Sequence, residues 1–306
     1  MISNYVQRVA NTAIYDVKGS YTQRNKLATQ MNKRIFETLS DEIINKNQVK
    51  FGRLAEIIKS FLPGIKVVVK PNRNEKNIAQ IGWNISSRSK LLEGFSVELL
   101  PKKNKKVVTD SRVCDAMHEI RHLIDYAFNP RFSSMKNRRA YSENFPEFNS
   151  RVDKYEKFYD SFLYADDMTY VQKERFHQNP ELEIKRRKIR LDKAIRGFMP
   201  KEASSQEKIK MLQGWRYSLM SEKNAYKDDI TYENEMEFLK KKKTEPSLPK
   251  SAEKELREKI KNEVYQKNVE KFFFDEKIKI LKTIIKEEIA GHRREHAKQL
   301  RASLAN

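Results

Sequence analysis

The stretch from Ser111 to Phe128 constrains the fold of this chain more than any other part of it. It reads SRVCDAMHEIRHLIDYAF, and its apolar residues recur at helical spacing on one side: Val113, Met117, Ile120, Ile124 and Ala127. Polar residues occupy the other side: Ser111, Asp115, His118, His122 and Asp125. An amphipathic helix of this kind is stable when its apolar side packs on a core. We therefore predict a packed helix here, with Asp110 or Ser111 as its N-cap and Pro130 beyond its end.

The polar side of this predicted helix carries a metal-binding pattern. His118-Glu119-Ile120-Arg121-His122 fits H-E-x-x-H, in which residues four apart point two imidazoles at one metal ion. Glu119 lies beside them, where a carboxylate can take a proton from a metal-bound water. With five histidines in 306 residues, a chance match is expected in about one such chain in a hundred. The pattern therefore predicts a hydrolytic metal centre.

The chain before this helix alternates between helical and extended patterns. Apolar spacing predicts helices over Gln23 to Lys46 and Arg53 to Phe61, the second ending at the turn Pro63-Gly64. Period-two and β-branched segments then predict three strands: Ile65 to Lys70, Ile81 to Ile85 and Phe95 to Leu100.

The chain after it is predicted to be mainly helical. We expect helices over Glu147 to Tyr164, Glu181 to Phe198 and Ala252 to Leu304, while residues 201 to 240 are helical in composition but poorly patterned. A lysine run followed by Pro246 and Pro249 predicts a linker near 240–250. The predicted organisation is a polar N-terminal arm at 1–22, a catalytic domain at 23–200 and a basic helical region at 201–306.

Two helices, three strands and an H-E-x-x-H helix in this order resemble the zincin metallopeptidases of gluzincin type, over about residues 23 to 165. The resemblance implies an α+β fold: a minimal zincin domain with a small mixed sheet, followed by a mainly helical C-terminal region. It further implies a zinc-dependent endopeptidase in which His118 and His122 bind Zn²⁺ and Glu119 is the general base. The strand Phe95 to Leu100 would then offer its edge to an extended protein substrate.

Catalytic zinc usually has three protein ligands, so a third must be found. The metzincin extension is excluded because Asp125 and Phe128 occupy its glycine and histidine positions. Asp125 follows His122 so closely that we interpret it as an orienting or surface group. The resemblance implies a glutamate on a following helix, and we predict Glu147, within P-E-F-N-S-R, with Glu143 as the alternative.

Other polar residues complete the list of candidates. Tyr141, Arg151 and His177 are unranked candidates for stabilising the transition-state oxyanion. The sequence His292-Arg293-Arg294-Glu295-His296 fits the inverted pattern H-x-x-E-H, but no acidic residue follows it and its neighbours are basic. We interpret it as the cationic end of the last helix.

The formal net charge of +21 predicts acidic partners. These would be an acidic docking surface on a protein substrate, or nucleic acid or anionic lipid bound by the basic C-terminal region. Cys114 is the only cysteine, so no internal disulfide is expected. The N-terminal residues lack the apolar core of a signal peptide, and no stretch is apolar enough for a membrane span. We expect a cytoplasmic protein, or one secreted without a cleaved signal.

The polar, lysine-rich composition with one protease motif resembles bacterial effector proteases delivered into host cells, and metallopeptidase modules of phage and mobile elements. Two other functions stay open at this point. One is a basic protein that binds nucleic acid or anionic membranes and keeps a vestigial metal site. The other is a zincin-fold hydrolase that acts on a bond other than a peptide.

Overall fold

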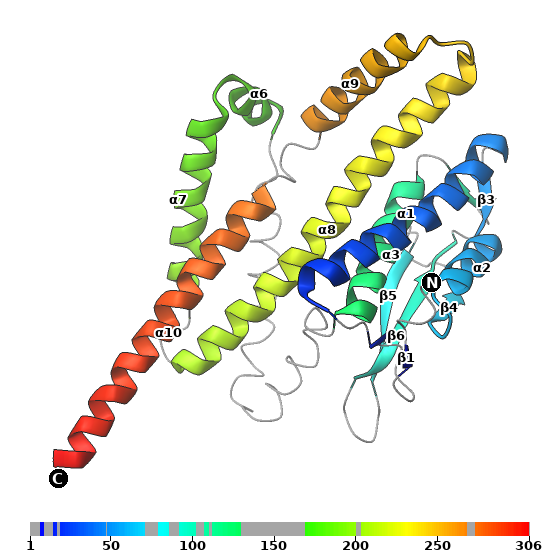
Figure 1. Cartoon of the computed structure of the whole chain (residues 1–306). Helices are drawn as coiled ribbons and strands as arrows, with labels where there is room; N and C mark the ends of the chain where they lie inside the picture. The colour runs from blue at the N-terminus through cyan, green and yellow to red at the C-terminus, as the bar shows by residue number, and fades with distance from the viewer. Residues whose placement is uncertain are drawn as a thin grey trace. The chain divides into compact units, whose positions relative to one another are not determined.

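The computed structural model describes residues 7–8, 15–16, 19–46, 48–70, 79–85, 92–101, 107–109, 112–129, 169–199, 203–267 and 273–305. The chain forms two compact units (Figure 1). The first contains Met1–Lys136 and Asn224–Asn268, and the second contains Asn137–Lys223 and Val269–Asn306. The boundary falls within helix α8 (Ser205–Thr244), which therefore contributes to both units. The domain limits predicted from the sequence, at residues 22 and 200, stay predictions.

The helices of the first unit are α1 (Tyr21–Lys46), α2 (Phe51–Phe61), α3 (Val113–Phe128), the C-terminal part of α8 and α9 (Lys250–Lys267). Helix α1 buries Met31, Ile35, Leu39 and Ile43, which recur every four residues and form one side of the helix. The first three helices lie within a few residues of the predicted ranges, because each carries a single apolar stripe that faces the core.

Short strands complete the first unit. Strands β1 (Gln7–Arg8) and β2 (Tyr15–Asp16) pair antiparallel, as do β3 (Gln48–Lys50) and β7 (Val107–Thr109). The largest sheet has the order β4 (Lys66–Val69), β6 (Leu92–Leu99), β5 (Ala79–Ile85), with β4 parallel and β5 antiparallel to β6. The described part of the chain is thus mainly helical with small sheets, which is consistent with the predicted α+β class and helical C-terminal region.

Strand β6 is the middle strand of its sheet. Val97 pairs with Val67 on one side and Ile81 on the other, and its side chain is buried. The prediction that Phe95 to Leu100 offers an edge to a substrate is therefore wrong, because its main chain is paired with a strand on each side. An apolar strand with clean alternation is as typical of a central strand as of an edge strand.

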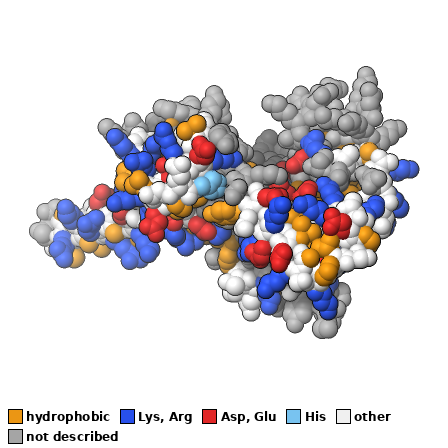
Figure 2. Space-filling view, turned by 90° about the horizontal axis from the view of Figure 1, so that it is seen from above, with side chains coloured by type: hydrophobic (Ala, Val, Ile, Leu, Met, Phe, Trp, Pro, Cys, Tyr) orange, Lys and Arg blue, Asp and Glu red, His pale blue; other side chains and the backbone are white. Residues whose placement is uncertain are grey.

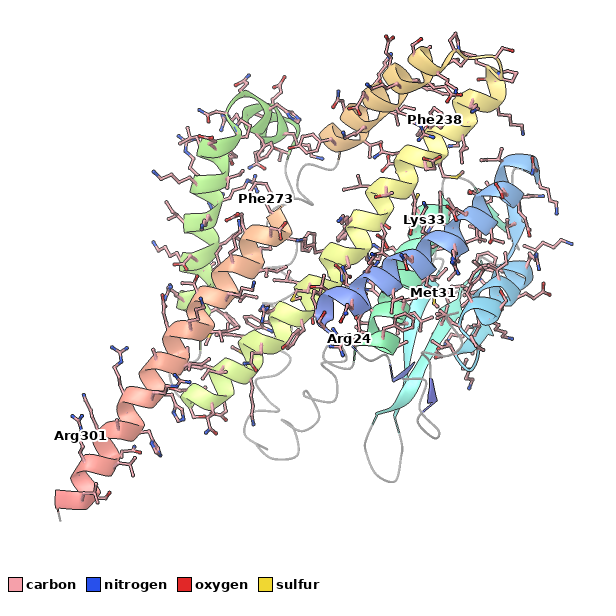
Figure 3. All side chains as sticks on the ribbon, viewed as in Figure 1. Arg24, Met31, Lys33, Phe238, Phe273 and Arg301 are labelled. Atoms are coloured by element: carbon pink, nitrogen blue, oxygen red, sulfur yellow. The ribbon has the colours of Figure 1, made fainter. Side chains whose placement is uncertain are left out.

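The core of the first unit lies between the helices and this sheet. Its members include Ile35 of α1, Ile58 of α2, Val97 of β6 and Ile120 of α3, each fully buried. Helix α8 adds Tyr232, whose ring stacks on Phe36 at 4.2 Å between centroids. Farther along α8, Phe238 forms a second cluster with Ile260 and Val264 of α9 (Figure 3).

The second unit is helical in its described residues. It contains α6 (Tyr170–Gln178), α7 (Pro180–Phe198), the N-terminal part of α8, and α10 (Phe274–Ala305). Thr169 closes a capping box at the start of α6, and the Asn179 side chain caps α7. Phe273 (Figure 3) packs its ring on Phe176 at 5.6 Å between centroids. The predicted helix Glu181 to Phe198 is confirmed as α7.

The prediction of one helix from Ala252 to Leu304 is wrong, since α9 ends at Lys267 and α10 begins at Phe274. The two helices have different packing partners. Ile260 and Val264 of α9 pack on α8 in the first unit, whereas α10 packs against α7 in the second. No described helix is both long and apolar enough to cross a bilayer.

Candidate metal centre

Helix α3 has the two sides that its sequence predicts. Val113, Met117, Ile120, Ile124 and Ala127 are each 0% exposed and anchor the helix in the core. His118 and His122 point from another side, one helical turn apart. The predicted N-cap is wrong: Arg112 occupies that position and no side chain caps the helix. Its guanidinium instead pairs with Asp115 in the first turn, with 2.6 Å between Nε and Oδ2.

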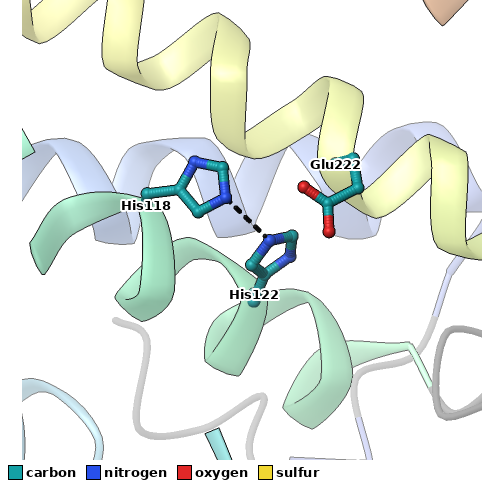
Figure 4. A group of neighbouring side chains, drawn as sticks. All are labelled: His118, His122 and Glu222. Atoms are coloured by element: carbon teal, nitrogen blue, oxygen red, sulfur yellow. Dashed lines mark hydrogen bonds between the residues drawn. The ribbon is translucent and has the colours of Figure 1, made fainter. Parts of the chain in front are cut away.

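The two imidazoles converge on one point. The Nε2 atoms of His118 and His122 lie 3.0 Å apart, with the rings at 81° to each other (Figure 4). Two nitrogens bound tetrahedrally to one zinc ion at 2.0–2.1 Å would lie about 3.3 Å apart. The observed separation is close to that value, so the pair is placed to share one metal ion.

A carboxylate from α8 joins the two histidines. Glu222 brings a carboxylate oxygen to a group in which the ligand atoms of His118, His122 and Glu222 all lie within 4.8 Å of one another (Figure 4). Glu222 lies two residues before Asn224, where the part of α8 that belongs to the first unit begins. Because α8 is one continuous helix, the contacts of its next two turns with α3 also place Glu222. Two histidines and a glutamate could therefore hold a metal ion.

Asp229 fixes the orientation of His118. Its Oδ2 lies 2.8 Å from Nδ1 of His118. A carboxylate at Nδ1 favours the tautomer that carries the proton there, which makes Nε2 the nitrogen that could bind a metal. Glu222 and Asp229 are seven residues apart on α8 and so lie on one side of the helix. One side of α8 thus supplies both a candidate ligand, Glu222, and the residue that orients another candidate ligand, His118.

Two tyrosine rings pack against the histidines. The Tyr226 ring meets His118 edge-on at 4.7 Å between centroids, and the Tyr126 ring is nearly parallel to His122 at 6.0 Å. Both tyrosines are half-buried. These rings restrict rotation of the imidazoles and lower the local polarity around the ligand atoms.

A buried ion-pair cluster lies next to the histidines on the same two helices. Arg121, 1% exposed, binds Asp125 of α3 through Nε at 3.1 Å and Asp228 of α8 through Nη1 at 2.8 Å. The Asn32 side chain of α1 donates to the same oxygen of Asp228 at 2.8 Å. The Asn224 side chain of α8 donates to Asp125 at 3.0 Å. This network ties α1, α3 and α8 together in one register.

The ion-pair cluster is charged and mostly buried, which shifts its pKa values. Burial, opposed in part by Arg121, raises the pKa of Asp125 and of Asp228 above the usual range. Burial would lower the pKa of Arg121, but its attraction to Asp125 and Asp228 outweighs that effect and raises it. Asp125 is therefore neither a metal ligand nor a surface residue; it is a partner of Arg121.

Of the other residues predicted to take part in the site, the structure describes Glu119 but not the candidates between residues 141 and 151. Glu119 is half-buried on α3, beside His118 in sequence. Glu147, Glu143, Tyr141 and Arg151 lie outside the described residues, so the roles proposed for them stay predictions.

The two remaining histidine candidates lie in the second unit. His177 is exposed at the end of α6. His292 and His296 lie near the exposed end of α10, and within the described ranges no third ligand joins them in a metal-binding group.

Sequence reasoning missed Glu222 and Asp229. They lie in the segment that is helical in composition but poorly patterned, and the signal was their spacing of seven residues on one helix. No family model, no curated protein and no solved structure matches this chain.

Proposed function

We propose that this chain is a zinc-dependent endopeptidase. The observation that carries the proposal is the convergence of both H-E-x-x-H histidines with Glu222, which comes from a different helix. Two imidazoles and one carboxylate are the ligand set of many zinc peptidases, in which a fourth position stays open for water or substrate. The Asp229 contact at His118 matches the support that metal-binding histidines usually have.

The chemistry follows from the position of Glu119 in the motif. Zinc bound at the three ligands would polarise the scissile carbonyl and lower the pKa of a water molecule. Glu119 directly follows His118 on α3, and we propose that its carboxylate accepts the proton of that water. The same carboxyl group then donates the proton to the leaving amine.

An extended substrate would pair with an outer strand of the sheet. Since β6 is paired on both sides, we propose β5, which packs beside α3 and is an outer strand among the described residues. The net charge of +21 favours protein substrates that carry an acidic docking surface.

Metal content tests the ligand set. The full-length protein should bind about one zinc per chain, as measured by mass spectrometry of the metal. Glu222→Gln should lose most of this zinc because the amide is a poorer ligand, whereas Glu147→Gln should keep it. The opposite result would make Glu147 the third ligand. Retention of zinc by both variants would contradict the proposal of a carboxylate ligand at either position.

Proteolysis tests the mechanism. Glu119→Gln should keep zinc and lower the cleavage rate of an unstructured protein substrate by about 10²–10⁴, since general base catalysis is lost. Asp115→Asn, an exposed carboxylate on the same helix, is the matched control and should cleave normally. If Glu119→Gln cleaves as fast as the unmodified protein, the mechanism is wrong.

A further inference from the structure

Helix α7 has a buried side and an exposed side of unusual composition. Arg187, Leu191 and Ile195 are buried in the second unit. Between Leu182 and Lys193, the opposite side carries six exposed residues: Leu182, Lys185, Arg186, Ile189, Arg190 and Lys193. At 3.6 residues per turn these six fall within about 140° of the helix circumference. We call this set the outer face of α7.

The cations of the outer face have no acidic partners among the residues that the structure describes. Within the described residues, Lys185, Arg186, Arg190 and Lys193 form no ion pair. The nearby carboxylates bind other residues. Glu183 accepts from Arg187 at 3.1 Å, and Asp192 accepts from Arg196 at 2.9 Å. Glu181, the remaining acidic residue of α7, lies in its first turn.

In the most lysine-rich run of the chain, most of the lysines have partners within the protein. In the run Lys240 to Lys243, Lys240 pairs with Glu237 and Lys242 pairs with Glu253. Lys243 donates to the main-chain oxygen of Ile44. That run therefore contributes to the protein's own packing, whereas no described carboxylate pairs with the cations of the outer face of α7.

Two aliphatic side chains lie among the four cations. Ile189 is 61% exposed and Leu182 is 42% exposed, although most large aliphatic residues of the described chain are buried. Figure 2 shows basic (blue), apolar (orange) and acidic (red) side chains interspersed at the left of the view, where α7 and α10 lie. Exposed aliphatic residues gain nothing from a phosphate backbone, but they are favourable at the boundary between headgroups and acyl chains.

We propose that the outer face of α7 binds the surface of a membrane that contains anionic phospholipid. The four cations contact lipid phosphates and carboxylates, and their alkyl chains reach toward the headgroups. Ile189 and Leu182 insert between the headgroups, with the helix axis parallel to the membrane plane. This binding needs neither zinc nor Glu119, so it stands independently of the proposed peptidase activity.

Vesicle cosedimentation of the full-length protein tests the proposal. The protein should bind vesicles that contain phosphatidylserine, should not bind pure phosphatidylcholine, and should dissociate as salt is raised. Replacing Lys185, Arg186, Arg190 and Lys193 together by Gln should weaken binding by at least about a hundredfold, at roughly fivefold per charge. Glutamine keeps a high helix propensity, so α7 should stay folded, which circular dichroism checks.

Two further variants make the result specific. Replacing Lys250, Lys254, Lys259 and Lys261 of α9 by Gln removes the same number of charges from a helix that also carries several glutamates, and this variant should bind normally. Ile189→Gln should weaken vesicle binding several-fold and leave binding to duplex DNA unchanged.

Three outcomes would overturn the proposal. The first is normal vesicle binding by the variant that lacks all four α7 cations. The second is equal loss in the α9 control, which would show that only net charge matters. The third is binding of the unmodified protein to duplex DNA but not to anionic vesicles, which would identify the outer face as a nucleic-acid surface.

Discussion

Helices α3 and α8 meet through two polar clusters that differ in how their charge is balanced. In the ion-pair cluster, Arg121 lies between Asp125 and Asp228, so the cluster contains its own cation. The candidate metal centre, next to it on the same helices, brings together His118, His122 and Glu222, with Asp229 behind His118. The folded chain supplies the cation that balances the carboxylates of the ion-pair cluster. The candidate metal centre instead combines two imidazoles with a carboxylate, a ligand set that suits an added cation.

Because of this difference, the two clusters contribute in different ways: one to the register of the helices and the other to metal binding. A buried ion pair contributes little net stability compared with apolar packing, but it strongly disfavours any arrangement that separates its members. Arg121 can therefore fix the register of α8 against α3. That register places Glu222 and Asp229 opposite the histidines. The metal centre then depends on the ion-pair cluster, while the ion-pair cluster does not depend on the metal.

The largest expected effect comes from removing the shared cation. Arg121→Met should lower the free energy of unfolding by about 3–5 kcal/mol, because it leaves two carboxylates buried without their partner. Chemical denaturation measured by circular dichroism gives this value. The variant should also bind zinc more weakly, since α8 loses its register with α3.

Arg112→Met is the matched control for this prediction. Arg112 lies on the same helix and pairs with Asp115, but both side chains are considerably more exposed than those of the ion-pair cluster. Its loss should lower stability by less than about 1 kcal/mol. Equal destabilisation by the two substitutions would show that the buried cluster has no special role.

The same two helices show what the sequence could and could not predict. The positions of His118 and His122 follow from one helical turn, so local spacing was enough to pair them. Asp229 meets His118 across 111 residues of chain, a contact that no local pattern encodes. The buried sides of helix α8 were also hard to predict, because Tyr232 and Met236 pack in the main core while Phe238 packs on α9, and no single apolar stripe results. The sequence accordingly predicts the third ligand on a nearer helix, at Glu147.

An intermediate effect is expected at the contact between Asp229 and His118. Asp229→Asn keeps the size of the side chain but removes the negative charge that holds the proton on Nδ1 of His118. Zinc affinity should fall by about 10–100-fold. Competition with a chromophoric chelator measures this change, and the free energy of unfolding of the zinc-free protein serves as the structural readout.

The two readouts separate a positioning role from a structural one. A positioning role lowers zinc affinity in the Asp229→Asn variant and leaves the zinc-free protein nearly as stable as before. A loss of stability with unchanged zinc affinity would show that Asp229 supports packing alone. That result would also weaken the contrast between the two clusters.

The smallest expected effect is a pH dependence that belongs to the ion-pair cluster. Burial raises the pKa of Asp228 in spite of Arg121, so the folded state binds this proton more tightly than the unfolded chain does. The contribution of Asp228 to stability is therefore complete below about pH 3.9, the usual aspartate value, and is lost as pH rises through the raised pKa. Denaturation of the zinc-free protein, followed as pH is lowered toward about 3.9, should show a steeper rise in the free energy of unfolding than the Asp228→Asn variant shows. If the free energy of unfolding changed with pH equally in both proteins, Asp228 would titrate normally and Arg121 would fully compensate its burial.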